Sequence, residues 1–263
     1  MLNIDIPFLP ERAPKPRTSG ISMVMDKGLS VRETEDFVSV AADYTDFVKL
    51  GFGTSVITPQ LKEKIRILKQ ANIRVYLGGT LFEAFFVRNL FDKYRKFNDQ
   101  LGLDTVEISD GSISLDHRVK CEFIHKLSRD YMVLSEVGSK EAGILIAPGR
   151  WTEMMTTELE AGSFKVIGEA RESGNVGIYR PSGKAHTALI NKILSKVDKD
   201  KIIWEAPLKS QQVWFIKHFG NNVNLGNIAP SEIIPLETLR LGLRGDTFFN
   251  FLPADCMKFK PVI

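Results

Sequence analysis

The sequence predicts a single α/β domain folded as a (β/α)8 barrel. Eight short apolar, β-branched runs recur along the chain, and amphipathic segments lie between them. Strands that alternate with helices through short connections favour right-handed βαβ units and a parallel sheet. The length of 263 residues suits such a TIM barrel, which typically has about 250 residues. An open, doubly wound sheet is the alternative, because strand number alone does not require closure.

The chain is expected to divide into three parts. Residues 1–20 contain four prolines, which fix φ and remove hydrogen-bond donors, so this segment is predicted to be an extended arm. Residues 21–246 would form the barrel. Residues 247–263 form a Phe-rich tail that would pack across the barrel bottom or against a neighbouring copy, which leaves a homo-oligomer as an open outcome.

The apolar runs define the expected strands. They are apolar at nearly every position, as parallel strands covered on both faces should be. In chain order they are 22–27, 46–52, 74–79, 104–110, 132–138, 165–170, 201–206 and 223–228.

Helical periodicity marks the segments between the strands. In the first, Val31, Phe37, Val38 and Ala41 fall on one face, and acidic residues lie near its start. The last is expected to be capped near Lys209 and to stop at Gly220. The expected helical segments are 31–44, 61–72, 91–102, 116–128 and 210–220.

Two longer inserts follow the fifth and sixth strands, at residues 139–150 and 171–183. Barrels carry their active-site loops after the carboxyl ends of the strands. We therefore expect these two loops to border the site.

Composition excludes several classes of protein. Lys and Arg exceed Asp and Glu by only +3, so no charge excess calls for nucleic acid or an anionic membrane. Cys121 and Cys256 are too few for a disulfide framework or a thiolate metal cluster. No apolar run approaches the roughly 18 residues of a membrane span, and the first residues do not resemble a signal peptide. A cytoplasmic location is expected.

Charged or polar residues close nearly every apolar run. Because the carboxyl ends of barrel strands converge on one mouth, these side chains are expected to meet there. A structural ring of salt bridges is the alternative, since buried charges need partners. The residues are Asp26, Lys27, Lys49, Glu107, Ser109, Asp110, Glu136, Glu169, Glu205, Asn224 and Asn227.

The carboxylates in this set predict a hard cation. They lack histidine or cysteine companions at the strand ends, because all four histidines fall in helical or loop segments. Oxygen ligands of this kind favour Mg²⁺ over zinc. Glu107, Glu136 and Glu169 are the expected ligands, with Asp26 and Glu205 as outer partners.

Positive charges on the same rim predict binding of a small anion. Lys27, Lys49, Lys140, Arg171 and Lys209 are the candidates. Backbone amides at Gly78 and Gly79, together with Asn227 after the eighth strand, would add phosphate contacts, as loops and helix starts do in many barrels.

The sequence carries no G-x-S-x-G elbow, no Cys with an evident His partner and no G-x-G-x-x-G after a strand. Nucleophilic catalysis and a dinucleotide cofactor are therefore unsupported. From the residues alone, we expect a Mg²⁺-assisted enzyme acting on a small, multiply anionic substrate.

At these strand ends the sequence resembles the phosphosulfolactate synthase (ComA) family of coenzyme M biosynthesis. The likeness covers residues from about 20 to 248, in order and without a large gap. The matching segments are MDKGL (25–29), DFVKLGFGTS (46–55), GGTLFE (78–83), VEISDGS (106–112), EVGSK (136–140), EARESG (169–174), EAPLKSQQ (205–212), NLGNIAP (224–230) and LETLRLGLRGDTF (236–248).

The resemblance implies a Mg²⁺-dependent lyase that adds sulfite to phosphoenolpyruvate and gives (2R)-3-phosphosulfolactate. Lys140 is implied to be the general acid, and Lys49 and Asp26 complete the expected catalytic set. The remaining candidates are expected to bind phosphate and sulfite: Lys27, Arg171, Ser173, Lys209, Gln211, Asn227, Gly78 and Gly79.

Two departures keep other functions open. Ser139 stands where another basic residue is expected, and the loop at 141–147 is more apolar than the family pattern. A different nucleophile adding to an enolpyruvyl phosphate is therefore one alternative. A non-enzymatic role like that of heat-stress proteins resembling this family is the other, although an abandoned site should lose its costly buried charges.

Overall fold

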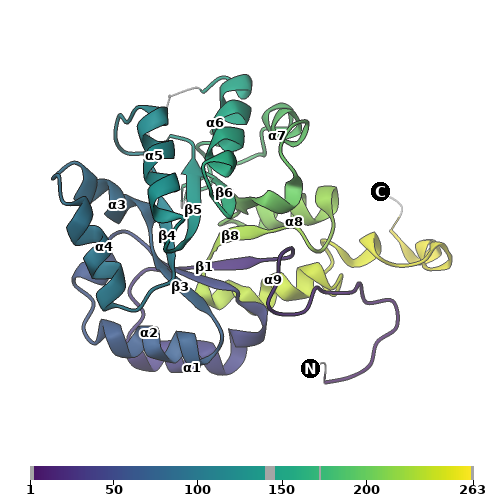
Figure 1. Cartoon of the computed structure of the whole chain (residues 1–263). Coiled ribbons are helices and arrows are strands. Elements are labelled where there is room, and N and C mark those ends of the chain that lie inside the picture. Colours follow the sequence, from purple (N-terminus) through teal and green to yellow (C-terminus); the bar gives the residue numbers. More distant parts are fainter. Residues whose placement is uncertain (1–2, 140–145, 172, 262–263) are drawn as a thin grey trace.

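The computed structural model describes residues 3–139, 146–171 and 173–261. Eight parallel strands form a nearly closed barrel with helices interleaved around it, which confirms the predicted fold class (Figure 1). Every expected strand run contains one observed strand. The strands are β1 (Ser22–Asp26), β2 (Phe47–Leu50), β3 (Arg74–Leu77), β4 (Thr105–Ile108), β5 (Met132–Val137), β6 (Lys165–Gly168), β7 (Ile202–Glu205) and β8 (Leu225–Ile228).

The barrel closes at a seam between β3 and β4. The hydrogen-bonded order is β3-β2-β1-β8-β7-β6-β5-β4, so these two strands stand at its ends. Side chains bridge them instead. The Glu107 carboxylate accepts a hydrogen bond from the Gly79 N–H at 2.6 Å, and Arg74 pairs with Asp104 at 2.7 Å near the amino ends of the strands.

The helices pack on the outside of the barrel. The five expected helical segments are confirmed as α1 (Val31–Ala41), α2 (Leu61–Gln70), α4 (Phe91–Gln100), α5 (His117–Leu127) and α8 (Lys209–Phe219). Four further helices in the described ranges belong to the predicted (β/α)8 pattern but had been given no span: α3 (Gly79–Phe86), α6 (Pro148–Glu160), α7 (Thr187–Leu194) and α9 (Ile233–Arg240).

Local sequence explains why three of these helices, α3, α6 and α9, had been given no span. Helix α3 is apolar almost all round, and α6 begins with Pro148-Gly149, which resembles a turn although proline suits a first helical position. Helix α9 contains Pro235. Because α6 begins at Pro148, the insert after β5 is shorter than the expected 139–150.

The barrel interior changes character along its axis. Its amino-terminal part is apolar, and its core residues alternate along the strands. Ionisable side chains occupy the carboxyl-terminal part, described below. The inner apolar cluster is Ile21, Met23, Phe47, Tyr76, Leu134, Ile167 and Ile203.

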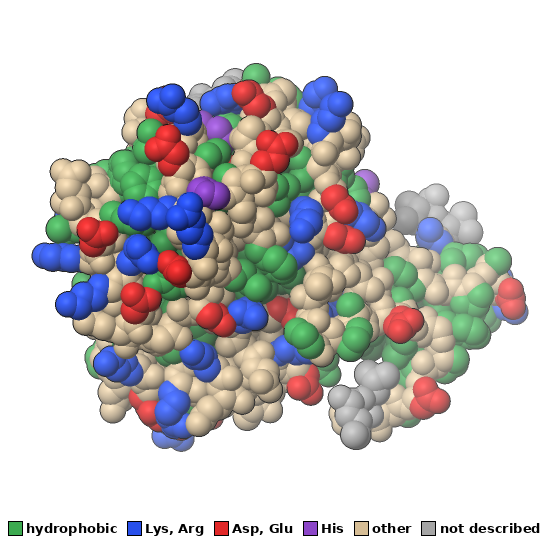
Figure 2. Space-filling view, viewed as in Figure 1, with side chains coloured by type: hydrophobic (Ala, Val, Ile, Leu, Met, Phe, Trp, Pro, Cys, Tyr) green, Lys and Arg blue, Asp and Glu red, His purple; other side chains and the backbone are tan. Residues whose placement is uncertain are grey.

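The N-terminal arm lies against the amino end of the barrel. Its cations bind the body of the protein: Arg12 pairs with Glu237 at 2.7 Å and Arg17 with Asp46 at 3.1 Å. The described part of the tail forms short 3-10 turns and projects beside the arm (Figure 1). Figure 2 shows apolar side chains gathered on this projecting segment, where Phe248 and Phe259 are exposed.

None of the helices seen in the described ranges has the length and apolar character that crossing a bilayer requires.

Candidate active site

A cavity of about 450 Å³ opens at the carboxyl ends of the strands. Such a volume suits a small-molecule ligand. The cavity is lined by Met25, Lys49, Gly51, Phe52, Gly78, Gly79, Thr80, Glu107, Ser112, Glu136, Glu169, Arg171, Ser173, Glu205 and Asn227.

Lys49 lies among the ionisable side chains that line the cavity. Its ammonium is 3.2 Å from Glu107 Oε2, 3.4 Å from Glu136 Oε2 and 3.1 Å from Glu205 Oε1. Burial alone would lower the pKa of Lys49, but the three carboxylates outweigh it and hold that pKa well above its ordinary value. Lys49 is therefore a fixed positive charge.

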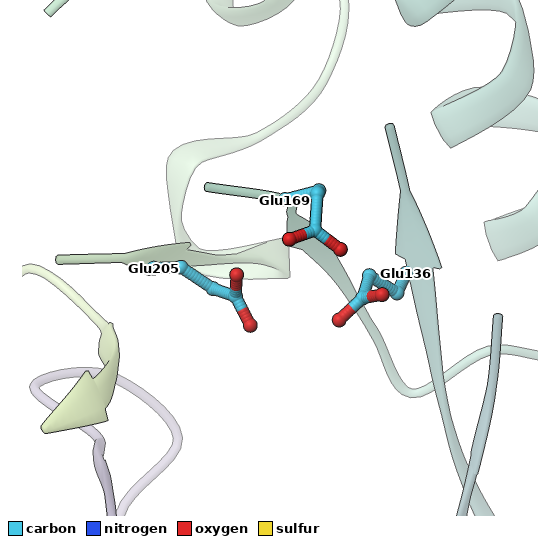
Figure 3. A group of neighbouring side chains, drawn as sticks. All are labelled: Glu136, Glu169 and Glu205. Atoms are coloured by element: carbon cyan, nitrogen blue, oxygen red, sulfur yellow. The ribbon is translucent and has the colours of Figure 1, made fainter. Parts of the chain in front are cut away.

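Three carboxylates form a group that could hold a metal ion. One ligand oxygen from each of Glu136, Glu169 and Glu205 lies within 4.8 Å of the others, and all three side chains are buried (Figure 3). They come from the ends of three neighbouring strands, β5, β6 and β7, and face a common space (Figure 3). An all-oxygen donor set of this kind fits Mg²⁺.

This trio differs from the expected ligand set. Glu107 instead accepts from the Gly79 N–H and contacts Lys49, whereas Glu205, expected as an outer partner, joins Glu136 and Glu169. Burial raises the pKa of Glu205, and the nearby Glu136 carboxylate adds to this rise against the opposing Lys49 ammonium. A cation would relieve this repulsion.

Asn227 adds a neutral oxygen to the cavity wall. Its side chain is 7% exposed, and within the described part of the chain no hydrogen-bond donor reaches its Oδ1. Its backbone has φ +56°, a left-handed conformation that asparagine tolerates better than most residues. An unsatisfied buried amide oxygen is costly, so this atom is suited to a ligand.

The loop after β6 brings Arg171 and Ser173 to the cavity. It is tied to the strand end, because the Arg171 N–H donates to Glu169 Oε1 at 2.6 Å and the Ile178 N–H donates to the Glu169 carbonyl at 3.0 Å. Gly177, at φ +66°, makes this close approach possible.

Gln211 supports this loop and does not line the cavity. Its Nε2 donates to the carbonyls of Gly174 (2.7 Å) and Gly183 (3.2 Å), and its Oε1 accepts from the Leu208 N–H. Its side chain is buried and both of its amide atoms are engaged. Gln211 therefore positions the loop, whereas the sequence analysis expected it to contact substrate.

Three other expected site residues lie elsewhere. Asp26 follows Met25, which lines the cavity, and successive strand residues point to opposite faces. Its carboxylate therefore pairs with Lys64 of α2 at 2.5 Å, on the helix side. Lys27 is exposed outside the cavity lining, and Lys209 pairs with Asp246 at 3.0 Å. Lys140 lies outside the described residues.

The remaining expected residues do converge. Lys49, Glu107, Glu136, Glu169, Arg171, Ser173, Gly78, Gly79 and Asn227 all line one cavity. Sequence reasoning missed Thr80, in the first turn of α3, and Ser112, in the loop after β4, whose hydroxyls carried no pattern. It also missed Tyr76, a member of the inner apolar cluster. Tyr76 and Gly78 are two positions apart and therefore point to the same face, which could have placed Tyr76 inside the barrel.

Comparison with known proteins supplies the family. A family model described as (2R)-phospho-3-sulfolactate synthase (ComA) matches residues 10–246. The chain belongs to this family. The resemblance inferred from the strand-end motifs is thereby confirmed.

Relatives agree with this assignment. The phosphosulfolactate synthase of Bacillus subtilis (strain 168) is 42% identical over 244 residues, covering 92% of this chain and 97% of that protein. The phosphosulfolactate synthase of Methanocaldococcus jannaschii is 44% identical over 236 residues, covering 87% and 94%. These relatives support an enzyme of the phosphosulfolactate synthase family.

Among solved structures, 3-hexulose-6-phosphate synthase from Salmonella typhimurium matches with a TM-score of 0.53 and 15% identity. The match covers 85% of this chain and 100% of that one. At this identity the likeness shows the shared barrel fold alone.

Proposed function

We propose that this member of the phosphosulfolactate synthase family adds sulfite to phosphoenolpyruvate, with Mg²⁺, to give (2R)-3-phosphosulfolactate. The observation that carries the proposal is the cavity itself. Buried carboxylates, a fixed ammonium and an arginine line one space at the mouth of a barrel of this family. This combination suits a small substrate with several negative charges and a divalent cation.

The bond changes define what the site must do. A sulfite lone pair forms a carbon–sulfur bond at the terminal methylene of phosphoenolpyruvate. The π electrons of the carbon–carbon double bond move toward the carboxylate as an enediolate-like species. The adjacent carbon then receives one proton, and the phosphate ester stays intact.

Glu136, Glu169 and Glu205 would hold Mg²⁺. When bound, the ion supplies Lewis-acid stabilisation of the charge that develops on the substrate carboxylate. The support for this placement is the donor set: buried carboxylate oxygens within 4.8 Å of one another.

The chain's own cations would bind the anionic groups. Arg171 can grip two oxygens of a phosphate or sulfite at once, while Lys49 adds a fixed charge beside the carboxylates. The amino end of α3 lies at the cavity wall, and its helix dipole would favour a further anionic oxygen there. Lys140 would deliver the proton, since the family resemblance implies that the lysine at its position acts as the acid.

A direct assay tests the reaction. Purified protein, Mg²⁺, sulfite and phosphoenolpyruvate are mixed, and the sulfonated product is followed by mass spectrometry together with loss of phosphoenolpyruvate absorbance. Product is expected only when all four are present, and a chelator should abolish it. Turnover with another nucleophile but not with sulfite would support the alternative addition reaction and reject this proposal.

Replacing Lys140 tests the proton donor. Lys140→Ala should abolish turnover and leave thermal unfolding unchanged. Lys192→Ala, at an exposed lysine of α7, is the matched control and should keep wild-type activity. Full activity in Lys140→Ala would remove the lysine from the mechanism without affecting the assignment of the overall reaction.

A further inference from the structure

The candidate cation site and the Lys49 ammonium share carboxylates. Glu136 and Glu205 belong to the trio that could hold a metal ion, and both are ion-paired with Lys49, at 3.4 and 3.1 Å. Glu169 has no ion pair with Lys49 among the pairs of the described residues. Two of the three potential ligands are therefore paired with the Lys49 ammonium.

The charge balance explains why the ammonium lies there. Four buried glutamates surround this region, each at most 3% exposed: Glu107, Glu136, Glu169 and Glu205. Buried ionised carboxylates are strongly unfavourable unless a cation compensates them. Lys49 supplies one positive charge from the middle of β2, a rigid strand, and its length lets it reach three of the four.

We propose that the Lys49 ammonium and the divalent cation compete for Glu136 and Glu205. Without the metal, the ammonium holds the carboxylates together as a stand-in cation. Binding of the metal weakens these ion pairs, because two positive charges that share the same carboxylates repel each other. This inference rests on the proposed function, since it assumes that the glutamate trio is the metal site.

A supporting role for Lys49 would give the opposite result. If Lys49 only oriented the glutamates for the metal, its removal would scatter the ligands and weaken metal binding. If it competes, its removal leaves a more negative site and tightens metal binding. The sign of the change in metal affinity decides between these two roles.

The experiment measures Mn²⁺ binding by electron paramagnetic resonance, which requires no turnover. Titrations use wild type, Lys49→Met and Lys64→Met at pH 8. Lys64 is the matched control: it is also buried and paired with a carboxylate, Asp26, but that carboxylate lies outside the trio.

Competition predicts that Lys49→Met binds Mn²⁺ at least about tenfold more tightly, a small part of the Coulomb repulsion between neighbouring charges in a protein interior. Lys64→Met should bind as wild type does. Mn²⁺ should also raise the melting temperature of Lys49→Met by more than that of wild type, because the metal replaces a missing charge.

Equal or weaker binding by a folded Lys49→Met protein would overturn the competition. Absence of Mn²⁺ binding in both wild type and Lys49→Met would reject the metal site of the proposed function, and the competition with it. Normal Mn²⁺ binding without product from sulfite and phosphoenolpyruvate would reject the proposed reaction alone.

A measurement on the wild-type protein covers the case in which Lys49→Met does not fold. The ε-methylene resonance of Lys49, assigned with Lys49→Arg in 13C-lysine-labelled protein, should shift as Mg²⁺ is added. The Lys64 resonance should stay in place. An unchanged Lys49 resonance at saturating Mg²⁺ would reject the competition independently of any variant.

Discussion

Replacing Gly177 by alanine tests whether the loop after β6 holds Glu169 in position. Gly177 has φ +66°, and a Cβ there would lie 1.9 Å from the Glu169 carbonyl oxygen. Gly183, in the same loop, has φ +77°, but its Cβ would meet nothing closer than the Gly174 oxygen at 3.6 Å. Both substitutions place an alanine at a positive φ, but only Gly177→Ala brings its Cβ into collision with the Glu169 carbonyl oxygen.

The expected cost follows from this difference. Both alanines would adopt a left-handed conformation, at about 1–2 kcal/mol, partly offset by a stiffer unfolded chain. Gly177→Ala must also open the 1.9 Å approach to at least about 3.4 Å. That displacement breaks the hydrogen bond from the Ile178 N–H to the Glu169 carbonyl, and leaving a buried partner unpaired costs about 1–3 kcal/mol more.

Urea unfolding and Mn²⁺ titration of the two variants check this reasoning. Gly183→Ala should lose about 1 kcal/mol of unfolding free energy and keep wild-type Mn²⁺ affinity. Gly177→Ala should lose at least about 1 kcal/mol more and bind Mn²⁺ more weakly, because Glu169 moves. Equal losses in both variants, with equal Mn²⁺ affinity, would refute the role assigned to this contact.

Three further predictions concern buried charges. Lys120→Met should lower the unfolding free energy by about 3–5 kcal/mol, because it leaves the buried Glu158 carboxylate without the ammonium that lies 2.8 Å away. In urea unfolding, the double variant Lys120→Met/Glu158→Met should recover part of this loss, and no recovery would argue against the pair. Burial, with help from Lys120, lowers the pKa of His117 below its ordinary 6.5. The unfolded chain therefore takes up the proton at a higher pH than the folded protein, and wild type should lose stability relative to His117→Gln as the pH falls from 7 to 5. Parallel curves of unfolding free energy against pH would contradict this. Glu205→Gln should weaken Mn²⁺ binding at least about tenfold and more than Glu107→Gln does, since Glu205 belongs to the trio. A larger loss of Mn²⁺ affinity in Glu107→Gln than in Glu205→Gln would instead support the ligand set expected from sequence.

The sequence pattern predicted the fold correctly because the signals for strands and helices are local. Runs such as 202–204 are apolar throughout, and a parallel strand buried on both faces leaves that signature whatever its neighbours. Helix α3, which had been given no span, lacks such a local signal. Helix α3 has Phe82 and Phe86 in an aromatic cluster with Phe123 of α5, so packing rather than periodicity selects its conformation.

Convergence at the barrel mouth was also accessible from sequence, because parallel strands bring their carboxyl ends to one side. This placed Lys49, Glu136 and Glu169 together correctly. It could not say which way each strand-end residue points. Asp26 and Met25 are adjacent in sequence, yet a shift of one position sends Asp26 to Lys64 and leaves Met25 in the cavity.

The composition and order of the residues thus determined a barrel of this family with a charged, carboxylate-rich mouth. Only the tertiary structure decided how those charges pair: Lys49 between three glutamates, Glu205 rather than Glu107 with Glu136 and Glu169, and Gln211 under the loop rather than in the cavity. The physical reason is that ion pairing depends on a few ångströms between side chains from distant strands. Those distances are set by barrel closure and strand register, which no local stretch of sequence encodes.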